Sequence, residues 1–322
     1  MGIAYGILST AAIADKVIRS IQESKEGKVV AVASRDKKKA ENFAKIYGIP
    51  KFYGSYDSLL QDDEIDVIYN PLPNHLHKEW TIKSVNHGKH VLCEKPFALT
   101  VTEAVKMFEA GNQQQVNIME AFMYRFDPRI EQIKKILTQR ELGEIKYINF
   151  TFAHTLEEKL LKTNNYRLNK EAGGGALYDI AVYGLSLINY LLDGRKGELL
   201  HCKAIKRENN DIDRSIFLQL QYDNDIIANI TSSFQFYGNS LCIGGSAGEL
   251  EVTNIISQEE GELRIKKLES KEYYRESIPA FNSYTAMINH FNDCIIKNSS
   301  PFVTKSQTIE ILRLVEDVLS KI

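Results

Sequence analysis

The sequence predicts an α/β protein in two parts: a doubly wound parallel sheet, then an α+β domain with a large, mostly antiparallel open sheet. Through about residue 120, short apolar runs alternate with helical patterns, which is typical of parallel strands joined by helical crossovers. Beyond about residue 123, consecutive strand patterns are flanked by helices instead. The 322 residues are enough for two domains of ordinary size. We place these domains at residues 1–122 and 123–322.

The first part contains five expected strands, each a short apolar run of the kind that a sheet covered on both faces requires. The patterns between them have apolar residues three and four positions apart, so that one face of each helix can pack on the sheet. Right-handed crossovers would bring the strands into one parallel sheet. The expected strands are Ile3–Leu8, Val29–Ala33, Ile65–Tyr69, His90–Cys93 and Val116–Met119, and the expected helices are Ala12–Gln22, Lys37–Ile46, His75–Asn86 and Val101–Ala110.

The second part begins with a helical pattern and a long strand pattern, followed by a polar stretch that ends in three glycines and leads into another helix. Successive strand patterns with short turns come next, and two helical patterns close the chain. This order is typical of an α+β domain. The expected elements are the helices Pro128–Thr138, Ala176–Leu192, Tyr284–Ile296 and Ser306–Ile322 and the strands Ile145–His154, Ser215–Tyr222, Ile226–Phe236 and Glu249–Val252.

The composition excludes several classes of protein. Lysine and arginine number 40 and aspartate and glutamate 42, so the net charge is −2 and the chain lacks the basic field of a nucleic-acid-binding protein. No apolar run reaches the roughly 18 residues that a membrane span requires. The apolar start Met1–Ala14 has no basic residues ahead of it, which favours a first strand over a signal peptide. We therefore expect a cytoplasmic protein without nucleic-acid or membrane partners.

The cysteines and histidines indicate neither a disulfide framework nor a metal site. The four cysteines lie far apart, as is typical of reduced thiols in the cytosol. His87, His90 and Cys93, with or without His75 and His77, have a spacing that could suggest a metal. However, His90 and Cys93 flank a strand in which successive side chains point to opposite faces, and no second clustered pair of ligands follows. We expect no metal.

A phosphate-binding turn is the first functional feature that the sequence indicates. Gly6–Ala14 joins the first strand to the first helix, and Ser9, Ala11 and Ala14 occupy the small-residue positions of the dinucleotide template G-x-G-x-x-G/A. Small side chains let backbone N–H groups approach a pyrophosphate, although serine and alanine lack the free access of glycine to positive φ. Tight packing of the helix on the strand could also explain them. The expected contacts are Ser9, Thr10, Ala11, Ala12 and Ile13.

The end of the second strand favours NADP over NAD. In the template, an acid about 20 residues beyond the turn binds the ribose 2′-hydroxyl. This chain has Ser34 and Arg35 at that point, and a hydroxyl with a guanidinium suits a 2′-phosphate. NAD stays an alternative, because Ser34 or Asp36 could simply cap the next helix.

A family resemblance becomes visible at Glu94-Lys95-Pro96, directly after the strand His90–Cys93. This motif resembles the hallmark of the Gfo/Idh/MocA family of oxidoreductases, which combine a dinucleotide-binding Rossmann domain with a substrate domain. Asn70–His77 resembles the nicotinamide-side loop of that family, and Gly173–Tyr183 resembles its catalytic-helix segment. Glu120–Arg125 brings the chain closest to the branch of dimeric dihydrodiol dehydrogenase and NADP-dependent D-xylose dehydrogenase.

The resemblance implies roles for individual residues. Lys95 and Tyr183 would be the acid–base pair, with Lys95 favouring the ionised form of Tyr183, and Asp179 would orient substrate or lysine. Many family members have histidine where this chain has Tyr183, which leaves open how the two residues divide the work. Each also has a structural alternative: a surface lysine, a core aromatic and a satisfied buried carboxylate. The residues implied in cofactor binding are Pro71, Leu72, Asn74, His77, Glu94, Lys95 and Arg167; for His77 and Arg167, a helix-face histidine and an exposed loop residue are alternatives.

The resulting hypothesis is an NADP-dependent oxidoreductase that transfers a hydride between nicotinamide and a secondary alcohol or hemiacetal of a sugar, cyclic polyol or dihydrodiol. A non-catalytic dinucleotide- or sugar-sensing protein is the alternative, since a fold does not imply a function. A third possibility is a glycosidase-like enzyme that re-reduces its own cofactor. We expect a homo-oligomer, a dimer or tetramer, that buries the open sheet. The residues expected to set substrate specificity are Phe152, His154, Phe234 and Phe236.

Overall fold

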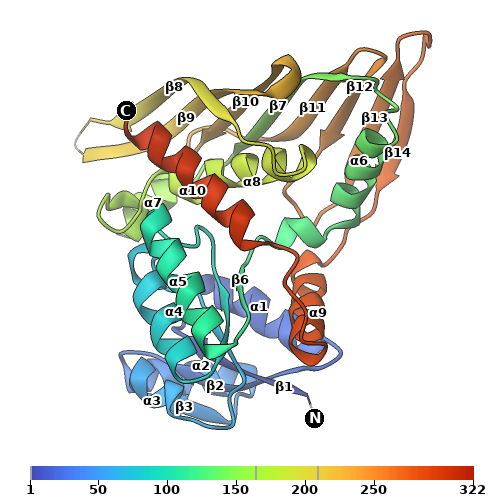
Figure 1. The fold of residues 1–322 in the computed structure, drawn as a ribbon. Helices are drawn as coiled ribbons and strands as arrows, with labels where there is room; N and C mark the ends of the chain where they lie inside the picture. Colours follow the sequence, from blue (N-terminus) through green and yellow to red (C-terminus); the bar gives the residue numbers. More distant parts are fainter. Residues whose placement is uncertain (1, 164, 209) are drawn as a thin grey trace. The chain divides into compact units, whose positions relative to one another are not determined.

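A computed structural model describes residues 2–163, 165–208 and 210–322, which form two compact units (Figure 1). The first unit comprises Met1–Met123 and Asn282–Thr308, and the second comprises Tyr124–Phe281 and Ile309–Ile322. Helix α9 (Ser283–Ile296) therefore lies in the first unit, where it contacts α1 and β2. The functional domains at residues 1–122 and 123–322 stay a prediction. Within the described ranges, no helix combines the length and the hydropathy needed to cross a membrane.

The first unit is built on a six-stranded sheet in the order β3-β2-β1-β4-β5-β6, and all of its neighbouring strands are parallel. This order is that of the dinucleotide-binding doubly wound fold. It brings the loops after β1, β2, β4 and β5 to the carboxyl edge of one sheet. The strands are β1 (Ile3–Leu8), β2 (Gly27–Ala33), β3 (Lys51–Tyr53), β4 (Val67–Asn70), β5 (His90–Cys93) and β6 (Ile118–Glu120).

The helices of this unit largely follow the apolar patterns, but two short elements were not predicted. Strand β3 has three half-buried residues, and α3 (Tyr56–Leu60) has only five residues, which is too short for a helical period. Ser55 caps α3 by accepting a hydrogen bond from the N–H of Ser58. The remaining helices are α1 (Ala12–Glu23), α2 (Lys37–Tyr47), the 3₁₀ turn η1 (Asn74–Leu76), α4 (His77–Asn86) and α5 (Val101–Gln114).

The second unit is built on an eight-stranded sheet in the order β14-β13-β12-β11-β7-β10-β9-β8. Only the pair β7–β10 is parallel, so the predicted mostly antiparallel open sheet is confirmed. The strands are β7 (Ile145–Ala153), β8 (Glu198–Arg207), β9 (Asn210–Tyr222), β10 (Ile226–Ser233), β11 (Gly238–Gly245), β12 (Gly248–Thr253), β13 (Gly261–Lys267) and β14 (Tyr274–Ile278).

Helices cover one face of this sheet (Figure 1). Along β10, buried residues alternate with half-buried ones, as expected for a sheet with one packed face. Gly184 allows α8 to pack closely, because a Cβ at this position would lie 2.6 Å from the ring of Phe150 on β7. The helical elements are η2 (Met123–Phe126), α6 (Pro128–Thr138), α7 (Glu157–Lys162), η3 (Tyr166–Leu168), a π-helical turn η4 (Leu177–Ala181), α8 (Val182–Leu191), η5 (Asp223–Asp225) and α10 (Lys305–Leu319), which begins in the first unit.

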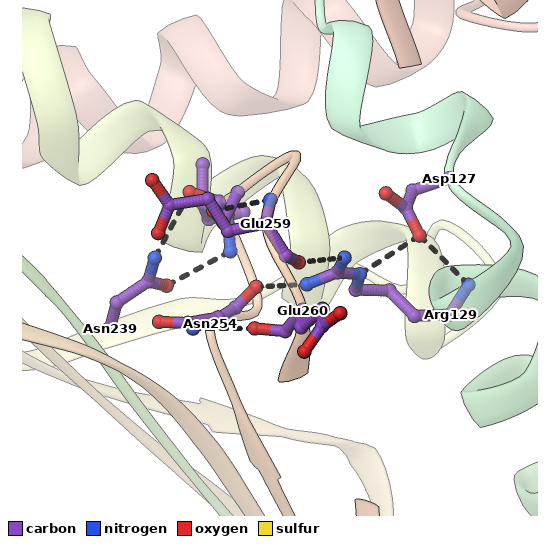
Figure 2. Close-up of polar contacts among 8 residues, drawn as sticks. Asp127, Arg129, Asn239, Asn254, Glu259 and Glu260 are labelled. Atoms are coloured by element: carbon purple, nitrogen blue, oxygen red, sulfur yellow. Dashed lines mark hydrogen bonds and ion pairs between the residues drawn. The ribbon is translucent and has the colours of Figure 1, made fainter. Parts of the chain in front are cut away.

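A buried arginine holds the loop between β12 and β13 (Figure 2). The fully buried Arg129 guanidinium pairs with Asp127 at 2.9 Å and donates to the carbonyl oxygens of Glu259, at 2.8 Å, and Asn254. Asn254 has φ +53° and donates from its amide to the carbonyl of Glu260 at 2.7 Å. Because a buried charge is stable only with such partners, losing either side of this pair should cost about 3–5 kcal/mol.

The loop that follows β5 is anchored by a buried acid. The backbone N–H of Phe97 donates to one oxygen of the Glu120 carboxylate at 2.9 Å, and the hydroxyl of Thr308 donates to the other at 2.7 Å. The Lys95–Pro96 peptide bond in this loop is cis. Glu120 thus fixes the backbone two residues beyond Lys95.

The variant Glu120→Gln tests this anchor. Burial raises the pKa of Glu120 from 4.5 to about 7, against the hydrogen bonds from Thr308 and Phe97 that favour its charged form. Between these two pH values the folded chain retains a proton that the unfolded chain has released, so the free energy of unfolding falls as pH rises. Glutamine does not titrate. We expect the parent to lose about 3 kcal/mol relative to the variant across this range.

Urea unfolding of both proteins at several pH values measures the difference. Glu109→Gln, on the exposed face of α5, removes the same charge and is the control. Parallel pH profiles for Glu120→Gln and the parent would contradict the assignment.

Candidate functional site

The turn after β1 leaves the N-terminus of α1 open. Ala11, at the N-cap position, offers no side-chain cap to the helix N–H groups. The Ser9 hydroxyl accepts from the N–H of Ala11 at 3.3 Å, and the Ser9 N–H donates to the carbonyl of Ala33 on β2 at 2.9 Å. Contrary to our expectation for a serine, Ser9 takes the left-handed conformation of a template glycine, with φ +82°. An uncapped helix N-terminus carries a partial positive charge and N–H groups that suit a phosphate.

The predicted contact residues of this turn are accessible. Ser9, Thr10, Ala11 and Ile13 are half-buried, and Ala12 is exposed. Small side chains, open N–H donors and the left-handed turn together fit the pyrophosphate of a dinucleotide.

At the end of β2, Asp36 rather than Ser34 caps the next helix. The Asp36 carboxylate accepts from the N–H groups of Lys38, at 2.9 Å, and Lys39, at 3.2 Å. The Ser34 hydroxyl accepts from the N–H of Asp36 at 3.2 Å. Arg35 is exposed and lies near Tyr56 of α3. Because the carboxylate is occupied in capping, Ser34 and Arg35 are the groups at this strand end that suit a 2′-phosphate.

The loop after β4 is tied to the loop after β5 through His77. The ring of His77 is fully buried, with Nδ1 2.8 Å from the carbonyl oxygen of Pro96 and Nε2 2.7 Å from that of Leu72. Burial lowers the pKa of His77 from 6.5 to about 4, although both carbonyl contacts favour the cation. Pro71 and Asn74 are also buried. His77 therefore connects the two predicted cofactor loops through their backbones.

Glu94 and Lys95 follow β5 at the carboxyl edge of the sheet. Glu94 accepts a hydrogen bond from the Tyr69 hydroxyl at 2.7 Å, and its N–H donates to the carbonyl of Asn70 at 3.1 Å. Burial, with the Glu94 charge beside it, raises the pKa of Tyr69, so that the phenol stays a donor. The Lys95 side chain is half-buried. This edge is where open α/β sheets bind their ligands.

In the second unit, Asp179 pairs with a residue that the sequence reasoning assigned to the cofactor. The Asp179 carboxylate lies 2.9 Å from Nε of Arg167, whose guanidinium lies 4.9 Å from the ring centre of Tyr166. Burial opposes the charge of Arg167, but Asp179 together with Tyr166 and Tyr183 outweighs this effect, so that the pKa of Arg167 is raised. Arg167 is thus oriented by Asp179 within this unit.

Tyr183 lies on α8 in an aromatic cluster. Its ring centre is 5.3 Å from that of Phe152 on β7, in an edge-to-face arrangement, and 5.8 Å from that of Tyr124. The side chain of Tyr124 is fixed by a hydrogen bond to Ser186 at 2.8 Å. Tyr183 is 9% exposed. Tyr183 is thus packed like a core aromatic, and only a small part of its side chain is accessible to solvent. Its catalytic role therefore stays a prediction.

The predicted helix Ala176–Leu192 is not uniform, because the segment that contains Asp179 is a π-helical turn. Asp213 on β9 holds its start by accepting from the N–H of Leu177 at 2.6 Å. Gly175, with φ +103°, is required here, because a Cβ would collide with the Asp213 carboxylate. Burial raises the pKa of Asp213 from 3.8 to about 7. The sequence reasoning missed Asp213, since our expected strand began only at Ser215.

Comparisons with known proteins fit this arrangement. Residues 3–122 match an oxidoreductase family described as an NAD-binding Rossmann fold, and residues 130–251 match the GFO/IDH/MocA C-terminal domain. A trans-1,2-dihydrobenzene-1,2-diol dehydrogenase of Xenopus laevis is 29% identical over 100% of this chain and 98% of its own. A D-xylose 1-dehydrogenase (NADP(+)) of Haloferax volcanii is 28% identical over 98% of this chain and 95% of its own.

A solved structure extends the likeness to the fold. A 3-ketoreductase from Actinomadura kijaniata superposes with a TM-score of 0.92 at 24% identity, over 99% of this chain and 98% of that one. The two matched family regions follow one another along the chain and together span most of it. The chain therefore belongs to the GFO/IDH/MocA family of oxidoreductases.

Proposed function

We propose that this protein is an NADP-dependent oxidoreductase that transfers a hydride between nicotinamide and a secondary alcohol or hemiacetal of a sugar, cyclic polyol or dihydrodiol. The observation that carries this proposal is the combination of an open dinucleotide turn with Lys95 at the edge of the same sheet. The dihydrodiol dehydrogenase and the NADP-dependent xylose dehydrogenase named above support the substrate range. The substrate itself is to be found by screening aldoses, inositols and trans-dihydrodiols with both cofactors.

The residues present suit each part of this chemistry. When bound, the nicotinamide supplies the hydride acceptor or donor. The turn after β1 binds the pyrophosphate, and Ser34 and Arg35 bind the 2′-phosphate. Tyr183 Oη removes the hydroxyl proton during oxidation and returns it during reduction, while the charge on Lys95 Nζ stabilises the developing alkoxide. Asp179 positions Arg167 and the substrate beside them.

A non-catalytic sensor of dinucleotides or sugars is the rival proposal. Such a protein would have no need of Lys95, Asp179 and Tyr183 together, and this chain has all three. A glycosidase-like enzyme would re-reduce its own cofactor. Absorbance at the NADPH band separates the proposed oxidoreductase from both rivals, because only net oxidation or reduction of substrate changes it.

The cofactor preference is tested by Arg35→Ala. Because the guanidinium is proposed to bind the 2′-phosphate, which NAD lacks, we expect NADP affinity to fall by roughly tenfold to a hundredfold and NAD affinity to change little. Fluorescence titration with both cofactors measures this. Lys38→Ala, on the exposed first turn of α2, is a matched loss of charge. Equal losses of affinity for NADP and NAD would contradict the assignment of Arg35 to the 2′-phosphate.

The acid–base roles are tested by Lys95→Met and Tyr183→Phe. We expect each to lower kcat by at least about 10²-fold, since proton transfer and alkoxide stabilisation are both lost. The double variant should be little worse than either single one, because groups that act as a unit fail together. NADP affinity, measured separately, should survive. A kcat near that of the parent in Lys95→Met would favour the rival proposal of a non-catalytic sensor. A kcat unchanged in Tyr183→Phe would mean that Tyr183 only packs in the core.

We further propose a cytoplasmic homo-oligomer, a dimer or tetramer, that buries the half-exposed face of the eight-stranded sheet. On this face, Asn229 donates to Asn149 at 2.7 Å and accepts from Gln219 at 3.2 Å, which makes a hydrogen-bonded row of polar side chains across three neighbouring strands. Light scattering at micromolar concentration should give a multiple of the 36.6 kDa chain mass. Asn229→Arg should reduce it to one chain, because like charges would meet across a two-fold axis. A monomeric parent would overturn this proposal.

A further inference from the structure

His154 stands directly beyond β7, on the same aromatic surface as Tyr183. Its N–H donates to the carbonyl of Ser233 at 2.9 Å, and its carbonyl accepts from the N–H of Leu156 at 2.9 Å. The first bond continues the β7–β10 ladder and the second closes a tight local turn, and together they fix the backbone. Phe152 lies two positions earlier on the strand, so its side chain and that of His154 share one face.

Aromatic contacts also fix the imidazole ring. Its centre is 4.6 Å from that of Phe152, at an interplanar angle of 82°, and 6.2 Å from that of Tyr237. Phe152 in turn packs edge-to-face on Tyr183. The Tyr237 hydroxyl donates to the Asn254 side chain at 3.4 Å, on the loop that Arg129 holds. The His154 ring thus lies between Phe152, which is buried, and Tyr237, which is 68% exposed, so that one side of the imidazole packs on the core and the other lies at the surface of the second unit.

The ring nitrogens of His154 are available to a ligand. Across the described ranges, neither nitrogen makes a hydrogen bond, although the side chain is half-buried. Burial lowers the pKa of His154, while the nearby charge of Asp179 opposes this shift. The neutral imidazole has one N–H donor and one acceptor nitrogen. Because the side chain is only half-buried, these nitrogens are accessible, and a ligand hydroxyl can take the place of water on them.

We propose that His154 binds a non-reacting hydroxyl of the substrate and thereby selects polyhydroxylated rings, aldopyranoses or cyclic polyols, over dihydrodiols. A hydroxyl is both donor and acceptor, which matches a neutral imidazole. The exposed ring of Tyr237, next to the imidazole, offers apolar surface to the C–H faces of such a ring. A dihydrodiol has two hydroxyls on an otherwise apolar ring. When one of them reacts, only one hydroxyl is left to bind all the other polar groups of the protein site. This inference rests on the proposed oxidoreductase function and deepens it.

The discriminating variant is His154→Phe, which keeps an aromatic ring and removes both nitrogens. A site that hydrogen-bonds a substrate group rejects analogues without that group. We expect kcat/KM for the best aldose or inositol to fall by roughly tenfold to a hundredfold, mainly through KM. The value for trans-dihydrobenzenediol should stay level or rise. His154→Gln, which retains a donor and an acceptor, should recover part of the loss.

Two controls separate this result from damage to the fold or the cofactor site. NADP affinity of His154→Phe, measured by fluorescence quenching, should equal that of the parent. His87→Phe makes the same change at an exposed position after α4 and should leave both substrate classes unaffected.

The outcomes are distinct. A parent that turns over none of these substrates overturns the proposed function and this inference with it. An active parent whose preference survives His154→Phe within about threefold overturns only the role of His154. Equal loss for both substrate classes through kcat would also overturn it, because it would indicate a disturbed Tyr183 instead of a lost hydroxyl contact.

Discussion

A backbone group that is buried from water must find a hydrogen-bond partner inside the protein, and buried side chains supply such partners to the loops of this site. Glu120 accepts the N–H of Phe97, and Asp213 accepts the N–H of Leu177. Arg129 donates to two carbonyls of the β12–β13 loop. Each contact costs about 1–3 kcal/mol to break, since the buried partner would be left unsatisfied. Loops held in this way keep one conformation.

The consequence for chemistry is preorganisation. Lys95 lies two residues before the N–H that Glu120 binds, and Asp179 lies two residues after the N–H that Asp213 binds. Neither anchor needs to touch a substrate. Each fixes the backbone from which a residue of the proposed site extends, which would limit the reorganisation needed when charge develops there. Burial raises the pKa of both anchors to about 7, against hydrogen bonds that favour their charged forms.

The fold and the principal motifs could be predicted because they depend on local pattern. Five of the six strands of the parallel sheet are visible in the sequence as apolar runs, and the motif Glu94-Lys95-Pro96 consists of three consecutive residues. Strand β3 could not be predicted, because three half-buried residues at a sheet edge form no recognisable apolar pattern. Asp213 acts on a segment 36 residues earlier in the chain, and no spacing rule connects it with Leu177. The pairing of Arg167 with Asp179 depends on long-range geometry in the same way.

The turn after β1 shows how a local rule fails where a ligand is expected. A serine with φ +82° costs about 1–2 kcal/mol relative to glycine, and an alanine at the N-cap of α1 forgoes about 1 kcal/mol that serine or aspartate would supply. Both residues lower the stability of the protein without cofactor at this turn. Thr100 and Asp127 cap α5 and α6 normally, so the chain does not lack capping residues elsewhere. A capping side chain at Ala11 would compete for the N–H groups that a phosphate needs. The missing cap and the left-handed serine thus fit the proposal that a pyrophosphate binds at this turn and supplies the hydrogen bonds that the chain itself does not make.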